Sequence, residues 1–198
     1  DVGLAEGWTV IVVGNNNTGT GYSSFVAKSF YSGTDNRYSI LDHPNGIVSL
    51  WDDGSIDANV SVVSGSHLAN ANAILELSVD RNSKVHRFYK NGAQIGVDKT
   101  INQNNGYNMA ANNNFLVGTY NDESGTGIQS GYYLNGTVSE ILIFNQALTL
   151  DDRANINYYL SKKWGLESTV DSDGDGYTDA IELAADRSPT DNNNYCLL

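Results

Sequence analysis

The sequence is poor in cysteine and in positive charge, and it lacks long apolar runs. Cys196 is the one cysteine, so no disulfide can form within the chain. Eleven Lys and Arg stand against 23 Asp and Glu, which gives a net charge of −12. Because nucleic acids and anionic membranes attract cationic side chains, neither is expected as a partner. No apolar run approaches the roughly 18–20 residues that span a bilayer, so we expect no membrane insertion.

The composition favours turns and short strands. The 198 residues include 25 Asn and 20 Gly but only two Pro. Asn and Gly both tolerate left-handed backbone, which suits many tight turns. Twelve Tyr and three Trp complete the composition of an extracellular all-β protein. Since the first residue is not Met, we expect a mature form or an excised piece of a longer protein.

Short apolar segments separated by Asn, Gly, Asp and Ser predict about ten strands, a spacing typical of a sandwich or barrel. The segment 74–79 alternates, with Ile74, Glu76 and Ser78 on one face. Asn91-Gly92 is a strong hairpin signal, because a type I′ turn needs positive φ at both central residues. The expected strands are 8–13, 25–30, 38–41, 47–51, 59–63, 74–79, 84–90, 94–99, 115–120 and 137–144.

One amphipathic helix is predicted after the last strand. Thr149 is a suitable N-cap, with Asp152 completing a capping box, and Gly165 is the stop signal. Apolar residues recur at helical spacing and should cover an open part of the sandwich. These residues are Ile156, Tyr159, Leu160 and Trp164. Beyond Leu166 the chain becomes polar and then acidic, which places a domain boundary near residue 167.

The segment 171–182 has the pattern of an EF-hand-type calcium loop. Oxygen-bearing residues stand at loop positions 1, 3, 5, 9 and 12, with Gly176 at position 6 for the sharp turn. Without a cation these carboxylates would repel one another, and a set of about seven oxygens suits Ca²⁺ better than Mg²⁺. The predicted ligands are the side chains of Asp171, Asp173, Asp175, Asp179 and Glu182 and the carbonyl of Tyr177. A solvated acidic tail is the alternative.

This loop resembles a thrombospondin type 3 or dockerin-like repeat. The resemblance covers about residues 171–192, including Ser188-Pro189-Thr190-Asp191, which is similar to the connector of bacterial thrombospondin type 3 arrays. No helix-forming stretch precedes the loop, so a full helix–loop–helix hand is not expected. The resemblance implies a calcium-stiffened segment of a secreted protein. A dockerin has two such repeats, which makes cohesin binding unlikely for a chain with one.

Residues 8–166 resemble concanavalin A-like and laminin G-like jelly-roll domains. The resemblance depends on the segment 131–149, on Tyr158-Tyr159-Leu160-Ser161-Lys162-Lys163-Trp164-Gly165, and on the hairpin Phe88-Tyr89-Lys90-Asn91-Gly92. It implies an all-β antiparallel sandwich over residues 1–166, followed by a calcium-binding segment over 167–198. Because this fold serves lectins, adhesins, glucanases and lyases, function must be argued from the site.

The residues give little support to catalysis. Glu76 and Asp80 share a strand face but lie about 13 Å apart, too far for a glycosidase pair. His43, His67 and His86 form no metal-hydrolase motif. His86 beside Arg87 leaves a polysaccharide lyase as a remote alternative. We therefore expect no catalytic residues and no enzyme activity.

A binding module remains, and sugar sites combine aromatic platforms with Asn and Asp side chains. We therefore expect a non-catalytic carbohydrate-recognition module of a secreted or cell-surface, multidomain protein, with a glycan or polysaccharide as partner and Ca²⁺ as bound ion. A protein-binding or structural adhesin or spacer module is the alternative. The candidate ligand-binding residues, each of which also fits a core or loop role, are Trp51, Asp52, Tyr120, Asn121 and Asp122.

Overall fold

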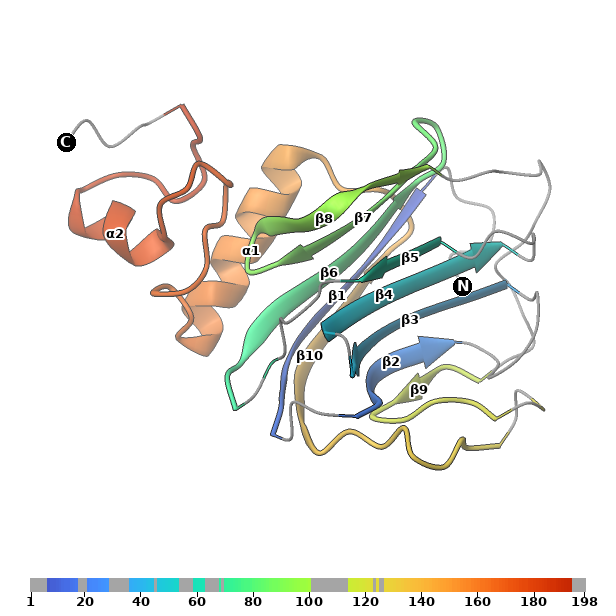
Figure 1. The fold of residues 1–198 in the computed structure, drawn as a ribbon. Coiled ribbons are helices and arrows are strands. Elements are labelled where there is room, and N and C mark those ends of the chain that lie inside the picture. The colour runs from blue at the N-terminus through green and yellow to red at the C-terminus, as the bar shows by residue number, and fades with distance from the viewer. Residues whose placement is uncertain are drawn as a thin grey trace.

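The structure is a computed structural model. It describes residues 7–17, 21–28, 36–44, 46–53, 59–62, 68, 70–100, 114–122, 124 and 127–193. Two antiparallel sheets form a sandwich, and the C-terminal helices lie to one side of it (Figure 1).

Each sheet has five strands within these ranges. Sheet A has the order β10 (Gly136–Phe144), β1 (Gly7–Asn16), β6 (Ala73–Asp80), β7 (Val85–Lys90) and β8 (Ala93–Thr100). Sheet B has the order β5 (Asn59–Val62), β4 (Gly46–Asp53), β3 (Asn36–His43), β2 (Ser23–Lys28) and β9 (Leu116–Val117). The prediction of an all-β sandwich is confirmed. Most expected strands fall within two residues of the observed ones, whereas the strand expected at 115–120 is reduced to β9.

The main core lies between the two sheets. Alternate residues of each strand point inward, so Val10 and Val12 of β1 face Phe25 and Ile40 of sheet B in one buried cluster. Trp8 is 1% exposed and lies 4.7 Å, centroid to centroid, from the ring of Tyr38. This period-two alternation leaves the other face of each sheet to be covered by something else.

The Asn91-Gly92 turn joins β7 to β8 as predicted. Both residues have positive φ, 52° and 85°, which is the geometry of a type I′ turn. The Asn91 side chain also accepts a hydrogen bond of 2.8 Å from the Ile74 N–H of β6. The turn is thereby fixed to sheet A at the end that faces the C-terminal segment.

Helix α1 (Leu150–Trp164) covers the outer face of sheet A, where Leu160 packs on Ile11, Val13 and Ile74. Its caps are those predicted: the Thr149 side chain accepts from the Asp152 N–H, and Gly165 is left-handed. The predicted apolar stripe is wrong at Tyr159, which is 54% exposed.

The buried side of α1 is partly polar. Arg153, Asn157 and Ser161 are buried there, at the helical spacing of four residues. The Arg153 Nε donates 2.9 Å to the Glu76 carboxylate on β6, and the guanidinium lies 3.4 Å from the centroid of the Tyr89 ring. Glu76 is thus a buried, paired residue of the outer face of sheet A.

The connection after α1 packs on the same face of sheet A. Leu166 and Val170 are buried with α1, and the Asp171 N–H donates 3.0 Å to the Asn91 carbonyl of the β7–β8 turn. A Cβ placed on Gly92 would lie 1.7 Å from the Asp171 carbonyl oxygen, so only glycine fits there. The segment 171–193, with the short helix α2 (Asp179–Ala184), is thus in contact with the sandwich. A division into two domains at residue 167 stays a prediction.

Candidate functional site

The predicted calcium loop is organised by its own aspartates. Asp171 accepts hydrogen bonds of 2.8 Å from the N–H groups of Gly174 and Gly176. Asp173 accepts from the Asp175 N–H, and Asp175 accepts from the Tyr177 N–H. Each carboxylate bends the backbone around itself, because a short Asp side chain reaches N–H groups two to five positions ahead. Hydrogen bonds between the loop's own residues therefore curve its backbone.

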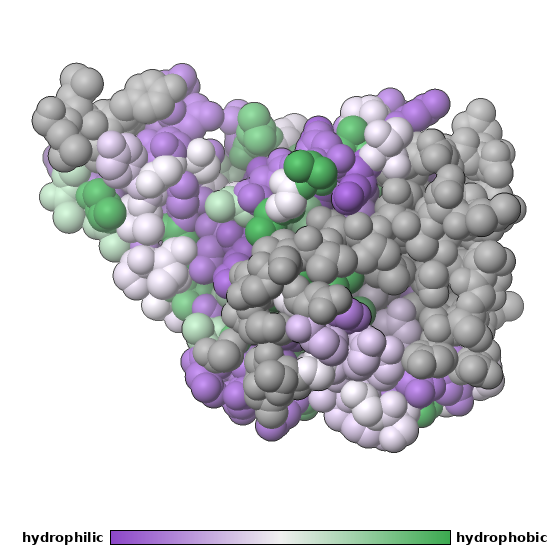
Figure 2. Space-filling view, in the orientation of Figure 1, coloured by the Kyte–Doolittle hydropathy of each residue, from purple (hydrophilic) through white to green (hydrophobic). Residues whose placement is uncertain are grey.

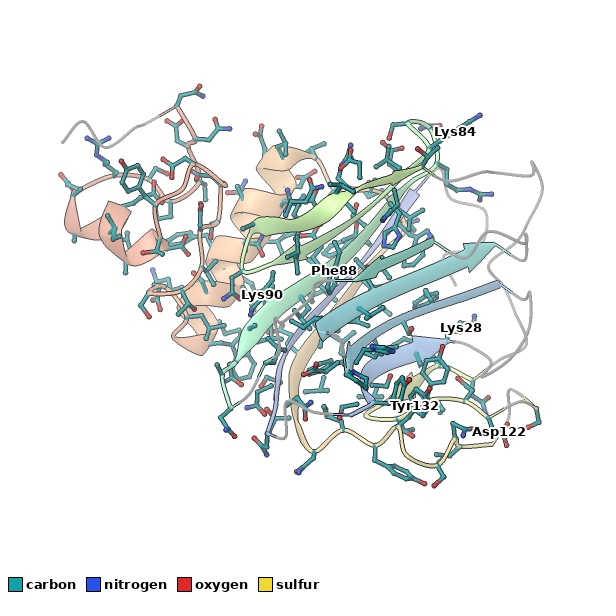
Figure 3. All side chains as sticks on the ribbon, in the orientation of Figure 1. Lys28, Lys84, Phe88, Lys90, Asp122 and Tyr132 are labelled. Carbon is teal, nitrogen blue, oxygen red and sulfur yellow. The ribbon has the colours of Figure 1, made fainter. Side chains whose placement is uncertain are left out.

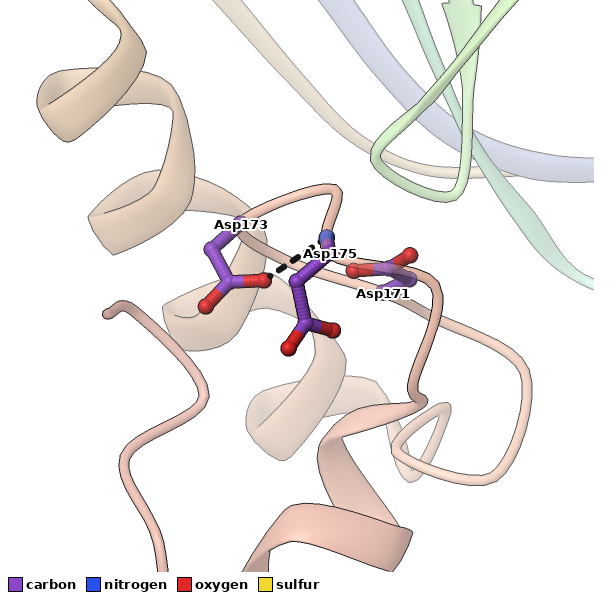
Figure 4. Close-up of side chains that lie close together, drawn as sticks. All are labelled: Asp171, Asp173 and Asp175. Atoms are coloured by element: carbon purple, nitrogen blue, oxygen red, sulfur yellow. Dashed lines mark hydrogen bonds between the residues drawn. The ribbon is translucent and has the colours of Figure 1, made fainter. Parts of the chain in front are cut away.

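This curvature brings three carboxylates together. One oxygen each from Asp171, Asp173 and Asp175 lies within 4.8 Å of the others (Figure 4). The second oxygens of Asp173 and Asp175 are buried and accept no hydrogen bond from the described residues. Glu182 on α2 is 0% exposed, and both of its carboxylate oxygens are likewise without a hydrogen-bond donor in that part of the chain.

The electrostatics of the loop reflect this crowding. Burial and the charges of Asp173 and Asp175 raise the pKa of Glu182 to about 7. Burial, together with the neighbouring Asp175 and Asp171, raises the pKa of Asp173 to about 6. Charged oxygens in a crowded site disfavour their own ionisation unless a cation compensates.

Asp179, the predicted ligand at position 9, has other partners. Its carboxylate accepts 2.9 Å hydrogen bonds from the backbone N–H and the side chain of Ser172, and another from the Ser161 hydroxyl on α1. The side chain is fully buried, and this burial raises its pKa. Asp179 therefore holds the loop on α1. Its position in the calcium-loop motif did not predict this structural role.

The remaining residues fit a hard cation. Calcium takes six to eight oxygen ligands, and buried carboxylates without donors are the group it would satisfy. Asp171, Asp173, Asp175 and Glu182 would hold it, with the Tyr177 carbonyl as a further oxygen. The geometry groups the oxygens of Asp171, Asp173 and Asp175, and the calcium role of all six predicted residues stays a prediction.

The predicted ligand-binding residues lie in sheet B or in the loop that follows its strand β9. Trp51 and Asp52 lie in β4, where they pair with Tyr38 and Arg37 of β3. For these two residues the structure describes the backbone alone.

The other three predicted residues form a loop after β9. Tyr120 and Asn121 are buried, at 5% and 0% exposure, and the Asn121 side chain donates to the Asn114 carbonyl. The Asp122 carboxylate accepts from the N–H groups of Ser124 and Gly127, so it shapes the loop. Their ligand-binding role stays a prediction.

An aromatic cluster around Tyr120 includes Tyr22, which the sequence did not mark as a candidate sugar-binding residue. The Tyr132 ring lies 5.0 Å from that of Tyr120 and 4.8 Å from that of Tyr22, and Tyr22 lies 4.8 Å from His43. Tyr120 packs with Ala27, Leu41 and Val48 on the outer face of sheet B. Figure 3 places Tyr132 and Asp122 beside β2 and β9. Tyr22 is 41% exposed, so this aromatic cluster has an accessible edge.

The residues considered for catalysis have other partners. Glu76 is paired with Arg153, and Asp80 accepts from the Asn82 and Ser83 N–H groups in the turn after β6. His86 is 0% exposed between the sheets, where its Nε2 lies 3.0 Å from the Ser49 hydroxyl. His67 lies outside the described residues.

No family model matches this chain, and no curated protein matches it either. Among solved structures it is similar to the carbohydrate-binding module CBM40 of the Ruminococcus gnavus IT-sialidase bound to α2,3-sialyllactose. That match has a TM-score of 0.56 at 13% identity and covers 73% of this chain and 79% of the other.

Two further matches have the same architecture. Domains LG4-5 of the mouse laminin α1 chain match with a TM-score of 0.55 at 9% identity, over 74% of this chain and 37% of theirs. A heptameric pentraxin of Limulus polyphemus matches with a TM-score of 0.52 at 14% identity, over 73% of this chain and 66% of the other. The fold is therefore a jelly-roll β-sandwich of the kind found in CBM40, laminin G and pentraxin structures.

A search of the described residues for membrane-spanning helices gave none: no helix there is sufficiently long and apolar.

Proposed function

We propose that this chain is a non-catalytic carbohydrate-recognition module of a secreted or surface-exposed protein, with a calcium-stabilised C-terminal segment. The observation that carries the glycan role is the aromatic cluster of Tyr22, His43, Tyr120 and Tyr132 on the outer face of sheet B. Exposed aromatic rings stack on the C–H faces of sugars, and the partly exposed Tyr22 offers such a ring. The CBM40 match to a sialyllactose complex is consistent with this role at the level of fold.

A glycan and polysaccharide array tests the proposal, with the chain applied in calcium and again in EGTA. We expect hits that weaken about 2- to 12-fold in Tyr22→Ala, because one lost aromatic contact costs about 0.5–1.5 kcal/mol. Tyr159→Ala is the matched control, since Tyr159 is also exposed but lies on α1. A blank array at high protein concentration would contradict the glycan role.

The calcium role is tested separately, by isothermal titration of CaCl₂ into the chain. Glu182→Gln removes a charged oxygen from the buried site and should weaken calcium binding by at least about 10-fold, as expected for a lost ligand. Asp191→Asn makes the same charge change at an exposed position outside the carboxylate cluster and should bind calcium normally. Unchanged binding in Glu182→Gln would contradict the proposed ligand set.

A protein-binding adhesin or spacer module is the second candidate. Helix α2 exposes Ile181 and Leu183, at 51% and 46%, which favours contact with another protein surface. Binding to proteins or cells that free sugars do not inhibit would support this candidate over the first.

A further inference from the structure

A cavity of about 620 Å³ lies where the C-terminal segment meets the β7–β8 hairpin. Arg87, Tyr89 and Gln94 line it from the sandwich, Arg153 from α1, and Asp171, Asp173 and Gly174 from the predicted calcium loop. Its volume falls within the range of about 300–1,000 Å³ that small-molecule sites have. In Figure 2 the surface near this junction is mixed, with hydrophilic residues next to apolar ones.

The floor of the cavity is fixed. Tyr89 and Arg153 are each 8% exposed. The Arg153 guanidinium carbon lies 3.4 Å from the centroid of the Tyr89 ring, and the guanidinium donates to Glu76 and, at 3.2 Å, to the Gly92 carbonyl. A guanidinium held on three sides keeps one orientation. The polar surface that it presents to the cavity is therefore preorganised.

The rim carries planar polar groups in fixed geometry. Arg87 makes a two-pronged contact with Asp98, with Nε and Nη2 donating at 3.1 and 2.8 Å, and the Gln94 amide donates 2.8 Å to the same carboxylate. Asn192 adds a second amide from the C-terminal segment, and the exposed Leu150 adds an apolar side chain. Donors, acceptors and one apolar contact thus surround the same space, which suits the hydroxyl and C–H groups of a sugar.

The charges around the cavity select against an anion. Both arginines are already paired, Arg153 with Glu76 at 2.9 Å and Arg87 with Asp98 at 2.8 Å. The remaining charged side chains of the wall are Asp171 and Asp173. A calcium ion in the loop would offset only two of the four negative charges of Asp171, Asp173, Asp175 and Glu182. A ligand that carries a carboxylate would therefore be repelled, whereas a neutral one would not.

We propose that this cavity is a second ligand site, specific for a neutral saccharide, whose affinity depends on calcium in the adjoining loop. The dependence on calcium rests on the calcium role proposed above; the site itself is independent of the aromatic cluster on sheet B. The coupling is direct, because the loop wall is also the wall of the cavity. Asp171 lines it and at the same time donates its N–H to Asn91 in the β7–β8 turn.

The test is a ¹H–¹⁵N NMR titration of the full chain with a panel of neutral oligosaccharides and with 3′-sialyllactose. We expect a neutral member of the panel to shift the amide signals of Gln94, Gly174 and Asn192, and EGTA to weaken this binding at least about 10-fold. Asn192→Ala and Gln94→Ala should each weaken it about 5-fold or more, as the loss of a hydrogen bond of about 1 kcal/mol implies. Asn155→Ala, an exposed amide on α1 outside the cavity lining, should not.

Each other outcome overturns a stated part of the proposal. Shifts confined to Tyr22 and Tyr132 would leave the aromatic cluster as a sugar site and refute the cavity. Binding of 3′-sialyllactose alone in the cavity would refute the neutral class, and cavity binding unchanged in EGTA would refute the calcium dependence. No shifts with any sugar would refute the cavity site and the proposed glycan function together.

Discussion

Arg153 of α1 and Glu76 of β6 form an ion pair of 2.9 Å in which the side chains are only 10% and 1% exposed. Seventy-seven positions separate them in the chain. The pair joins the helix to the middle of sheet A, next to strands that supply the walls of the cavity. Burial raises the pKa of Glu76 and Arg153 opposes that rise, so the carboxylate depends on its partner to remain charged.

Arg153→Met should destabilise the chain by about 3–5 kcal/mol in urea denaturation, because it leaves a buried carboxylate without its cation. The double variant Glu76→Met with Arg153→Met should recover most of the loss, since an apolar pair replaces the ionic one. Lys163→Met is the matched control: it breaks the more exposed pair with Glu140, at 2.9 Å, and should change the free energy of unfolding far less, because solvent screens an exposed pair. Equal losses in Arg153→Met and Lys163→Met would show that the buried pair has no special importance.

Asp179→Ala should lower the thermal midpoint in calcium and in EGTA alike. The change removes three hydrogen bonds to a buried carboxylate, each worth about 1.5–3 kcal/mol, that hold the loop on α1. Glu182→Gln should instead lower the midpoint chiefly in calcium. If Asp179→Ala abolished calcium binding and left the thermal midpoint in EGTA unchanged, Asp179 would be a calcium ligand and not the residue that holds the loop on α1.

Gly92→Ala should separate the C-terminal segment from the β7–β8 turn. The added methyl would meet the Asp171 carbonyl oxygen at 1.7 Å, in addition to the strain of an alanine at φ 85°. Gly131→Ala has nearly the same backbone strain, at φ 88°, with nothing within 4 Å, so it measures the strain alone. Limited proteolysis should release the segment after residue 166 faster in Gly92→Ala than in Gly131→Ala. Identical cleavage rates would contradict the close contact.

The free energy of unfolding should fall with rising pH in EGTA and be nearly independent of pH in calcium. The pKa of Glu182 is raised to about 7 and that of Asp173 to about 6, above their values in the unfolded chain. Between about pH 5 and pH 7.5 the folded chain therefore holds more protons than the unfolded one, and in EGTA the free energy of unfolding falls as pH rises. In saturating calcium it should change little over the same range, because the bound ion keeps these carboxylates deprotonated, as they already are in the unfolded chain.

Denaturation curves at half-unit pH intervals, with and without calcium, measure the two slopes. In Glu182→Gln, the free energies of unfolding measured with and without calcium should lie closer together across this pH range. Parallel curves in the unmodified chain would exclude competition between protons and calcium at these carboxylates.

The parts of the fold that depend on neighbouring residues could be predicted from the sequence. The Asn91-Gly92 turn and the Thr149 and Gly165 caps of α1 follow from local backbone preferences, and each is present. The alternation of Ile74, Glu76 and Ser78 correctly put these residues on one strand face. The sequence predicted that one helix would cover part of the sandwich, but it did not show which sheet face that helix would cover.

The parts that depend on distant residues could not be predicted in this way. The sequence does not show that Glu76 pairs with Arg153, which lies 77 positions away on α1. It also does not show that Asp179 accepts a hydrogen bond from Ser161 of α1. Tyr22 and Tyr132 are 110 positions apart, and no spacing rule connects them. Helical periodicity failed at Tyr159 because the polar residues Arg153, Asn157 and Ser161 occupy part of the buried side of α1.

The position of β1 inside sheet A, between two strands that come later in the chain, affects when the sheet can form. β1 is the first described strand, yet it lies between β6 and β10, and Thr9 pairs with Phe144. During synthesis one edge of β1 stays without its partner until β10 has left the ribosome. Contacts between such distant segments are slow to form, and an unpaired strand edge invites pairing with other chains. The sandwich should therefore form late, after β10 has been synthesised. The yield of folded protein should depend on keeping the unpaired edge of β1 away from other nascent chains.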